Sequence, residues 1–215
     1  MRNTRAITLI LILLILTAAS VQSFAQDASI PLPAPNRTGG KPLMEALDAR
    51  MTTRTFSTRE LDRATLGNLL WAAWGVNRPD GRRTAPSASN RQEIDVYAAT
   101  AEGVFRYDAQ SHALVPVLKE DIRALTGTQP FVATAPLNLI YVADLSKMGS
   151  GEEEGKLRTA NADTGFIGQN VYLFCASEGL ATVVRGMVDR ETLAAKMNLR
   201  PDQRITLSQT VGYPE

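Results

Sequence analysis

Hydrophobic residues recur along this chain at spacings typical of both helices and strands. Helical spacing of apolar residues predicts helices over residues 43–49, 61–74, 120–125, 164–178 and 190–197. Alternating or short continuous apolar stretches predict strands over residues 51–56, 94–100, 103–107, 113–118, 137–143 and 205–211. Strands and helices follow one another without a regular βαβ rhythm and without an internal repeat, so the predicted fold class is α+β.

Polar residues and glycines mark the ends of the two longer helices. Ser57 stands three residues before Glu60, the spacing of a capping box, and predicts a helix start at that point. Gly75 and Gly179 follow the last apolar positions of the two helices and predict their ends. Residues 149–155 hold three glycines and three glutamates, which predicts a polar, flexible loop.

The helix predicted over residues 164–178 is apolar on most of its faces, with Phe166, Ile167, Val171 and Leu173 among its members. A helix that is apolar all round must be buried on all sides. A dimer interface would bury it in a chain of this size, and we expect one. The alternative is the central helix of a monomeric core.

The first 25 residues form a separate segment. Arg2 and Arg5 precede an apolar run over residues 6–19, and Ser23-Phe24-Ala25 places small residues at the two positions that a signal peptidase reads. The run is short for a membrane span, so we expect residues 1–25 to be a cleaved secretory signal and the protein to be periplasmic or secreted. An uncleaved N-terminal anchor is the alternative.

The next residues predict a flexible lead-in to a domain over residues 42–215. Residues 26–41 contain three prolines and the pair Gly39-Gly40, which disfavour regular structure. The membrane would then be contacted only through the signal segment, during export.

Composition excludes several classes of function. The 23 basic and 22 acidic residues leave a net charge of +1, without the basic excess of a nucleic-acid-binding domain. One cysteine, Cys175, excludes an internal disulfide, and one histidine, His112, excludes a Cys/His zinc cluster. His112 lies in a polar, turn-like stretch and is a poor candidate for a catalytic base. We therefore predict no metal site and assign no catalytic side chain.

Residues 50–56 contain the first group of candidate binding residues. In a strand, Arg50, Thr52 and Arg54 point to the same side. Two guanidinium groups and a hydroxyl on one face suit a phosphate, because arginine donates bidentate, charge-assisted hydrogen bonds to its oxygens. A solvated strand face with scattered arginines is the alternative.

A polar loop holds the second group, Pro86, Ser87, Ala88, Ser89 and Asn90. Small residues and hydroxyls after a proline leave backbone groups open to a planar ligand. The amide side chain at the end of the group offers both a donor and an acceptor. An ordinary surface loop is the alternative.

Arg185 and Gly186 form the third group. A helix ends at Gly179, the chain runs extended through residues 182–184, and the second glycine permits close approach of a ligand to the backbone. An ordinary junction between a helix and a strand is the alternative.

Together, in this order and spacing, the three groups resemble the FMN-dependent nitroreductase family. The family's Arg-x-Ser-x-Arg/Lys-x-Phe start is similar to residues 50–56, with Thr52 in place of the serine. Several further stretches resemble the branch that includes SagB-type dehydrogenases, and the resemblance covers about residues 42–214. These matching stretches are residues 70–78, 83–88, 103–115, 168–170, 178–180 and 211–214.

This resemblance implies an α+β homodimer with a nitroreductase-like fold, in which a mixed, mainly antiparallel sheet packs with helices and the long helix lies at the dimer interface. FMN would bind between the subunits. Arg50, Thr52 and Arg54 would hold its phosphate and ribityl chain, and the loop from Pro86 to Asn90 would approach the ring from the other subunit. Arg185 and Gly186 would lie beside the reactive edge of the ring, where a backbone N–H near flavin N5 stabilises the reduced flavin.

The activity that the resemblance implies is that of an exported oxidoreductase. Hydride or electrons would pass through the flavin to a small organic substrate with a nitro, quinone or azoline-like group. The electron donor would be NAD(P)H or a periplasmic redox partner. The alternative is a non-catalytic relative that binds a flavin or another planar ligand, and a yellow chromophore in the purified protein would distinguish the two.

Overall fold

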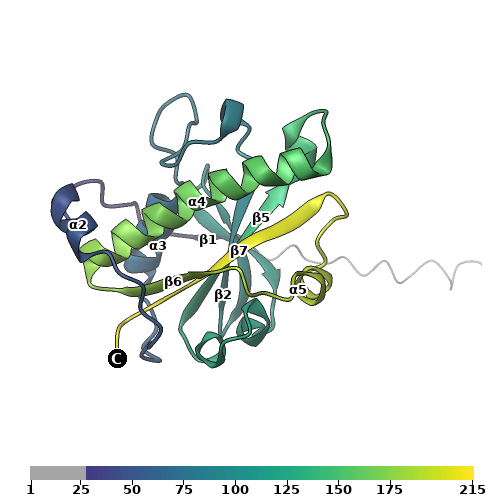
Figure 1. The fold of residues 1–215 in the computed structure, drawn as a ribbon. Coiled ribbons are helices and arrows are strands. Elements are labelled where there is room, and N and C mark those ends of the chain that lie inside the picture. The colour runs from purple at the N-terminus through teal and green to yellow at the C-terminus, as the bar shows by residue number, and fades with distance from the viewer. Residues whose placement is uncertain (1–27) are drawn as a thin grey trace, which may run out of the picture.

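A seven-stranded antiparallel sheet forms the centre of the protein in a computed structural model that describes residues 28–215 (Figure 1). The predicted signal segment, residues 1–25, lies outside the described residues. The strand order is β1-β4-β3-β2-β5-β7-β6. Every pairing between these strands is antiparallel. The sequence predicted a mixed, mainly antiparallel sheet, and the observed sheet has no parallel pair among the described strands. The strands are β1 (Ile30–Pro31), β2 (Ile94–Thr100), β3 (Gly103–Asp108), β4 (Ala113–Leu118), β5 (Leu137–Asp144), β6 (Ala181–Arg185) and β7 (Gln203–Gly212).

Helices cover both faces of the sheet because its strands alternate two sets of apolar side chains. In β2, Val96 and Ala98 belong to one core cluster, which also receives residues of helices α3 (Arg63–Trp74) and α4 (Glu153–Glu178). The intervening Tyr97 and Ala99 belong to a second cluster on the opposite face, with residues of α5 (Arg190–Lys196). The α+β class predicted from the sequence is confirmed.

The helix ends follow local chemistry that the sequence predicts in part. Gly75 ends α3 as predicted, and Gly179 ends α4 in the left-handed conformation that favours glycine, at φ 70°. The predicted capping box at Ser57 is wrong, because α3 begins later. Asp62 caps α3 by accepting a hydrogen bond from the Thr65 N–H at 2.8 Å.

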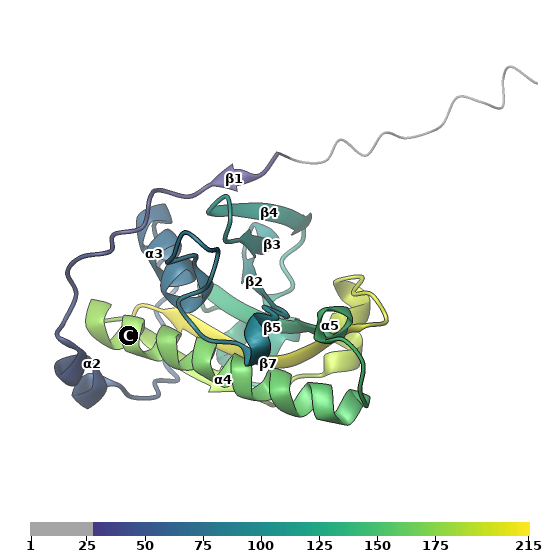
Figure 2. The same ribbon diagram turned by 90° about the horizontal axis from the view of Figure 1, so that it is seen from above.

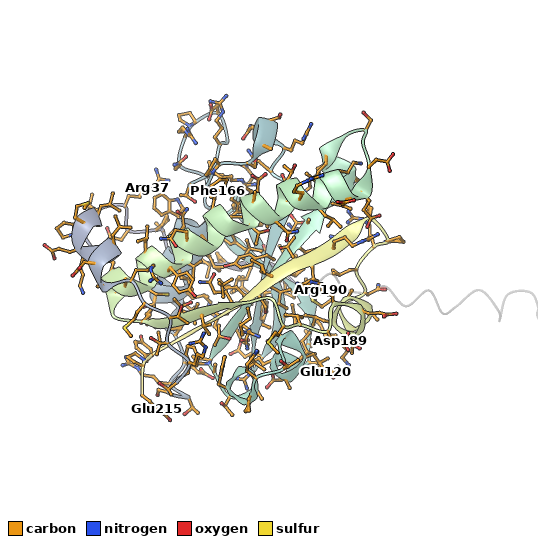
Figure 3. All side chains as sticks on the ribbon, in the orientation of Figure 1. Arg37, Glu120, Phe166, Asp189, Arg190 and Glu215 are labelled. Carbon is orange, nitrogen blue, oxygen red and sulfur yellow. The ribbon has the colours of Figure 1, made fainter. Side chains whose placement is uncertain are left out.

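Helix α4 is longer and less apolar than predicted. It begins at Glu153, so the last three residues of the loop predicted over residues 149–155 belong to the first turn of a 26-residue helix. Acidic residues near a helix N-terminus stabilise it without any apolar periodicity, which is why the pattern misses this end. Within the protomer Ile167 and Val171 are buried on one face, whereas Phe166 on the outer face is 48% exposed (Figure 3).

The lead-in predicted over residues 26–41 is more ordered than expected over its described part. Strand β1 pairs with β4 at one edge of the sheet, where Figure 2 shows it beside that strand. Leu32 is buried, and its N–H donates to the carbonyl of His112 at 3.0 Å. The His112 ring contacts the Pro33 carbonyl oxygen at 2.9 Å through Nε2. The folded domain therefore begins before Pro42.

A short helix, α2 (Leu43–Ala49), follows the lead-in and confirms the prediction for residues 43–49. It packs against the C-terminal half of α4 (Figure 1). Leu43, Met44 and Leu47 are nevertheless exposed, and Ala46 is its buried residue. No helix in the described part of the chain is long and apolar enough to cross a membrane.

Candidate functional site

The segment with Arg50, Thr52 and Arg54 is extended but does not form a strand. Among the described residues, one backbone hydrogen bond joins it to β6, from Thr53 N–H to the Thr182 carbonyl at 3.0 Å. A strand needs a continuing ladder of such bonds, and here the chain turns away after one. The segment therefore runs beside β6, which is the edge strand of the sheet.

Tyr172 on α4 is the residue that holds this segment. Its hydroxyl lies 3.0 Å from the Thr52 hydroxyl and accepts a hydrogen bond from the Val184 N–H on β6, also at 3.0 Å. The guanidinium carbon of Arg50 lies 5.4 Å from the centre of the Tyr172 ring, within cation–π range. One tyrosine thus joins the first and third groups of predicted site residues. The sequence does not predict this role, because it depends on the packing of α4 against β6.

Arg54 extends from the same segment into solvent. Its side chain is exposed, and no hydrogen bond or ion pair engages it among residues 28–215. Arg50 likewise has the Tyr172 ring as a neighbour and no carboxylate within ion-pair distance in this part of the chain. Two uncompensated guanidinium groups within five residues are suited to an anionic ligand such as a phosphate.

The Arg185 side chain does not face a ligand in this structure, which differs from the prediction. It is buried, and its guanidinium donates to the Thr126 carbonyl at 2.7 Å and to Asn138 Oδ1 at 3.0 Å. Burial lowers the pKa of Arg185 to about 10, so the group remains a cation at neutral pH. The side chain ties β6 to the turn before β5, and a ligand would have to use the backbone instead.

Gly186 supplies such a backbone. It is exposed, and the nearest side-chain atom to a Cβ built on it, from Leu207, is 3.9 Å away. Its carbonyl accepts a hydrogen bond from the Val188 N–H at 3.1 Å. The arrangement leaves room for a flat ligand to approach the chain closely.

The loop from Pro86 to Asn90 is attached to the other half of α4. The N–H of Ala88 donates to Asp163 Oδ2 at 2.9 Å, in the short turn η1 (Ala88–Asn90). Ser87 is half-buried and accepts a hydrogen bond from the Gln92 N–H at 3.0 Å through its hydroxyl. Pro86 and Asn90 are exposed.

Three residues in this loop and directly after it adopt left-handed backbone conformations that favour glycine. Ser89, Asn90 and Gln92 have φ values of 55°, 53° and 51°. Such conformations are common for asparagine and uncommon for serine and glutamine, so the surrounding contacts must hold the loop. The Asp163–Ala88 hydrogen bond and the Ser87–Gln92 hydrogen bond are two of these contacts, and the Gln92 side chain also donates to the Gly81 carbonyl at 3.2 Å.

A buried carboxyl pair lies directly behind the loop. Glu93 is fully buried, and neither of its carboxyl oxygens has a hydrogen-bond partner among the described residues. The pKa of Glu93 is raised to about 7, mainly by burial and also by the neighbouring Asp163, while Arg91 opposes the shift. Neither acid is predicted as a site residue from the sequence, because a Gln-Glu pair before a strand carries no distinctive signal.

The three predicted groups do not all meet in one protomer. Asp163, which holds the loop, and Tyr172, which holds residues 50–54, are nine residues apart on α4, or about 13 Å along the helix. The first and third groups are neighbours at β6, and the second lies further along the same helix. No cluster of three or more potential metal ligands occurs in the described part of the chain.

A cavity of about 520 Å³ lies elsewhere in the protein, at the sheet edge formed by β1 and β4. Leu61, Leu66, Phe105 and Leu114 contribute to its apolar wall. None of the predicted site residues lines it. The cavity is therefore separate from the candidate site along α4 and β6.

Comparison with known proteins gives a consistent result. The model of the nitroreductase family matches residues 47–213 of this chain. A proposed nitroreductase of Methanocaldococcus jannaschii is 31% identical over 154 residues, which are 67% of this chain and 78% of that protein.

Solved structures resemble the fold over most of its length. The crystal structure of a proposed nitroreductase from Ralstonia eutropha has a TM-score of 0.84 and 43% identity, covering 89% of this chain and 91% of that one. The NADPH:FMN oxidoreductase of Vibrio harveyi, solved with NAD⁺, has a TM-score of 0.62 and 18% identity, covering 80% of this chain and 69% of that one. At that identity the likeness concerns the fold alone.

Proposed function

This chain belongs to the nitroreductase family, and from that membership we propose that it is an exported, FMN-dependent oxidoreductase. The observation that carries the proposal is the pair of guanidinium groups of Arg50 and Arg54, which have no carboxylate partner in the described chain and belong to a segment that is hydrogen-bonded to β6 through Thr53. The V. harveyi neighbour, which shares the fold, is an FMN oxidoreductase by its description, and this supports the choice of cofactor.

The proposed site uses the chain's own groups in three ways. Arg50 and Arg54 would offset the charge of the FMN phosphate, with Thr52 hydrogen-bonded to the ribityl chain. The N–H of Gly186 would lie beside the flavin ring. When bound, FMN supplies the redox chemistry, accepting hydride from a donor and passing it to a small organic substrate.

No acidic or basic side chain is needed for that transfer, which agrees with the residues present. His112, the one histidine of the sequence, is engaged with Tyr107 at 2.9 Å and with Pro33, and burial lowers its pKa. It lies at the edge of the sheet that carries β1, away from residues 50–56 beside β6. The chain's task is to bind the ring, exclude water and orient the substrate.

A second copy of the chain would complete the site as a homodimer. Leu43, Met44 and Leu47 on α2 are exposed next to α4, and Phe166 on α4 is exposed as well (Figure 3). Exposed apolar groups gathered on neighbouring helices are typical of a permanent interface. The separation along α4 between the loop at Ala88 and residues 50–54 supports the view that a flavin would contact one group from each subunit.

Export follows from the sequence of residues 1–25 and extends the proposal. The protein would work in a periplasm or outside the cell, where NAD(P)H is scarce, so a periplasmic redox partner competes with NAD(P)H as the electron donor. The substrate would carry a nitro, quinone or azoline-like group. A non-catalytic relative that binds a flavin or another planar ligand is the second candidate. The buried Arg185 side chain favours this candidate, because it does not supply the expected contact to the flavin ring.

Titration of the apo-protein with FMN, followed by flavin fluorescence, tests the proposal. We expect saturable binding, and a loss of about tenfold to a hundredfold in affinity for Arg54→Ala, because a charge-assisted hydrogen bond contributes about 1.5–3 kcal/mol. Arg54→Lys should recover part of the loss, since the bidentate fork is missing. Arg63→Ala removes an equal charge from the wall of the separate cavity and should have no effect.

The outcomes separate the candidates. Absence of saturable FMN binding by the wild type would favour the non-catalytic relative. Tight binding that is indifferent to Arg54 would leave the family assignment intact and show that the phosphate lies elsewhere.

A further inference from the structure

Glu93 is an acid in a place where an ionised acid is unfavourable. Its side chain contacts neither water nor a cationic partner. The residue is 0% accessible to solvent, and neither carboxyl oxygen accepts a hydrogen bond from the described residues. An ionised carboxylate without hydrogen bonds in such a position loses its hydration without compensation. The neutral, protonated form is therefore the form that this fold accommodates.

Asp163 is the other half of the pair and has a defined structural task. It is 3% exposed and accepts the N–H of Ala88 at 2.9 Å. This hydrogen bond is stronger when the acceptor is ionised, because a charged acceptor roughly doubles the strength of the bond.

The other charged groups near Glu93 do not replace that arrangement. Arg91 is exposed, and it lowers the pKa of Glu93 less than burial and Asp163 raise it. Lys147 pairs with Asp95 at 3.2 Å, and Arg83 donates to the side chain of Gln92 at 2.8 Å. Both cations thus bind the side chains of residues close to Glu93 in the chain and not its carboxyl group. Protonation of Glu93 then removes the repulsion between the two acids.

We propose that neutral Glu93 is a positioning residue for the loop from Pro86 to Asn90, because it leaves the Asp163 carboxyl group in place as the acceptor of the Ala88 N–H. When Glu93 ionises, two buried carboxylates repel each other and Asp163 loses its place on the amide. The left-handed conformations at Ser89, Asn90 and Gln92 then lose one of the contacts that hold the loop, while the Ser87–Gln92 hydrogen bond remains. The loop is expected to be ordered below neutral pH and to loosen above it.

This inference deepens the proposed function, since the same loop would contact the flavin, and it rests on that function only for its effect on cofactor affinity. The effect on the loop is independent of any ligand. FMN should bind more weakly as the pH rises above about 7, where the pKa of Glu93 lies. If loop closure requires one proton, the closed population falls by up to about tenfold per pH unit above that value.

Hydrogen exchange of the full apo-protein between pH 6 and pH 8.5 tests the effect on the loop. After correction for the intrinsic exchange rate, the Ala88 amide should lose about tenfold or more of its protection over this range. The amide of Thr84 is a matched reporter in the same loop region, because it donates to the Gly75 carbonyl at 2.9 Å and not to a carboxylate. Its protection should not change with pH.

Three variants make the test specific. Glu93→Gln is neutral at every pH and should keep Ala88 protected throughout. Asp163→Asn retains an oxygen acceptor without a charge and should also remove the pH dependence, so it serves if Glu93→Gln does not fold. Asp163→Ala has no acceptor and should leave Ala88 weakly protected at every pH. Equal pH dependence of Ala88 protection in the wild type and in both neutral variants would overturn the inference.

Titration with FMN at pH 6 and pH 8.5 separates this inference from the proposed function. We expect about a tenfold loss of affinity at the higher pH for the wild type and little change for Glu93→Gln. A pH-dependent Ala88 amide in a protein that does not bind FMN would support the positioning role and refute the flavin site. FMN binding to a protein whose Ala88 amide protection does not change with pH would support the flavin site and refute the positioning role of Glu93.

Discussion

Replacing Glu93 with glutamine should make the protein more stable at alkaline pH, although the change removes a charged residue. Glutamine has nearly the shape of a protonated glutamate and cannot ionise. In the wild type, burial and Asp163 both disfavour the ionised form of Glu93, whose pKa is raised from 4.5 to about 7. The unfolded chain does not impose this penalty, so folding stability depends on the pH.

The sign and size of the effect follow from that difference. A carboxyl whose pKa is raised in the folded state contributes fully below its ordinary value of 4.5, and the contribution is lost as the pH rises through about 7. At about 1.4 kcal/mol for each pH unit between the two values, the total is about 3 kcal/mol. Between pH 5 and pH 8 the wild type should lose about 2 to 3 kcal/mol relative to Glu93→Gln.

Urea unfolding at pH 5 and pH 8, at one protein concentration, measures this difference. The variant and the wild type should unfold at similar urea concentrations at pH 5. At pH 8 the midpoint of the variant should be higher by about 1 M, for a slope of about 2 to 3 kcal/mol per M. Glu102→Gln removes an exposed carboxylate from the turn before β3 and should leave the pH dependence unchanged. Parallel pH curves for the wild type and Glu93→Gln would refute the reasoning.

Three further predictions follow from single contacts. Arg185→Ala should lower the free energy of unfolding, measured by urea unfolding, by about 3 kcal/mol, because it leaves the Thr126 carbonyl and Asn138 Oδ1 without their charged donor. A variant as stable as the wild type would contradict this structural role. Tyr172→Phe should weaken FMN binding about tenfold in the fluorescence titration, because the hydroxyl bridges Thr52 and Val184. It should lower the free energy of unfolding by about 1 kcal/mol. Unchanged affinity for FMN would exclude a role of this hydroxyl in holding the binding segment. His112→Ala should speed limited proteolysis within residues 30–37 with little effect on the unfolding midpoint, because it removes the ring that contacts the Pro33 carbonyl and keeps the backbone carbonyl that accepts from Leu32. Equal cleavage rates in the variant and the wild type would show that the ring does not hold this segment.

Local sequence determined the features that depend on neighbouring residues in the chain. Alternation of apolar residues predicted β2 from Ile94 to Thr100, as observed, because one strand faces two cores. Gly75 and Gly179 marked the ends of α3 and α4, since a helix end needs a residue that leaves the helical conformation easily. The family resemblance came from the same source, as residues at set spacings along the chain.

Tertiary structure decided the features in which distant segments meet. The sequence could align Arg50, Thr52 and Arg54 on one side of an extended segment. Tyr172, 120 residues beyond Thr52, holds that segment, and its single backbone hydrogen bond to β6 is not extended into a strand ladder. Arg185 was predicted at a ligand because of its place after a strand, whereas the direction of its side chain was decided by acceptors on β5 and before it.

The buried acids show the same division most clearly. Glu93 and Asp163 are ordinary polar residues in the sequence, 70 positions apart, and nothing in their local patterns indicates that either is buried. Packing of α4 over the start of β2 brings them together and removes water from both. A pKa depends on solvent and on neighbouring charges in space, so the chemistry of this pair exists only once the chain has folded.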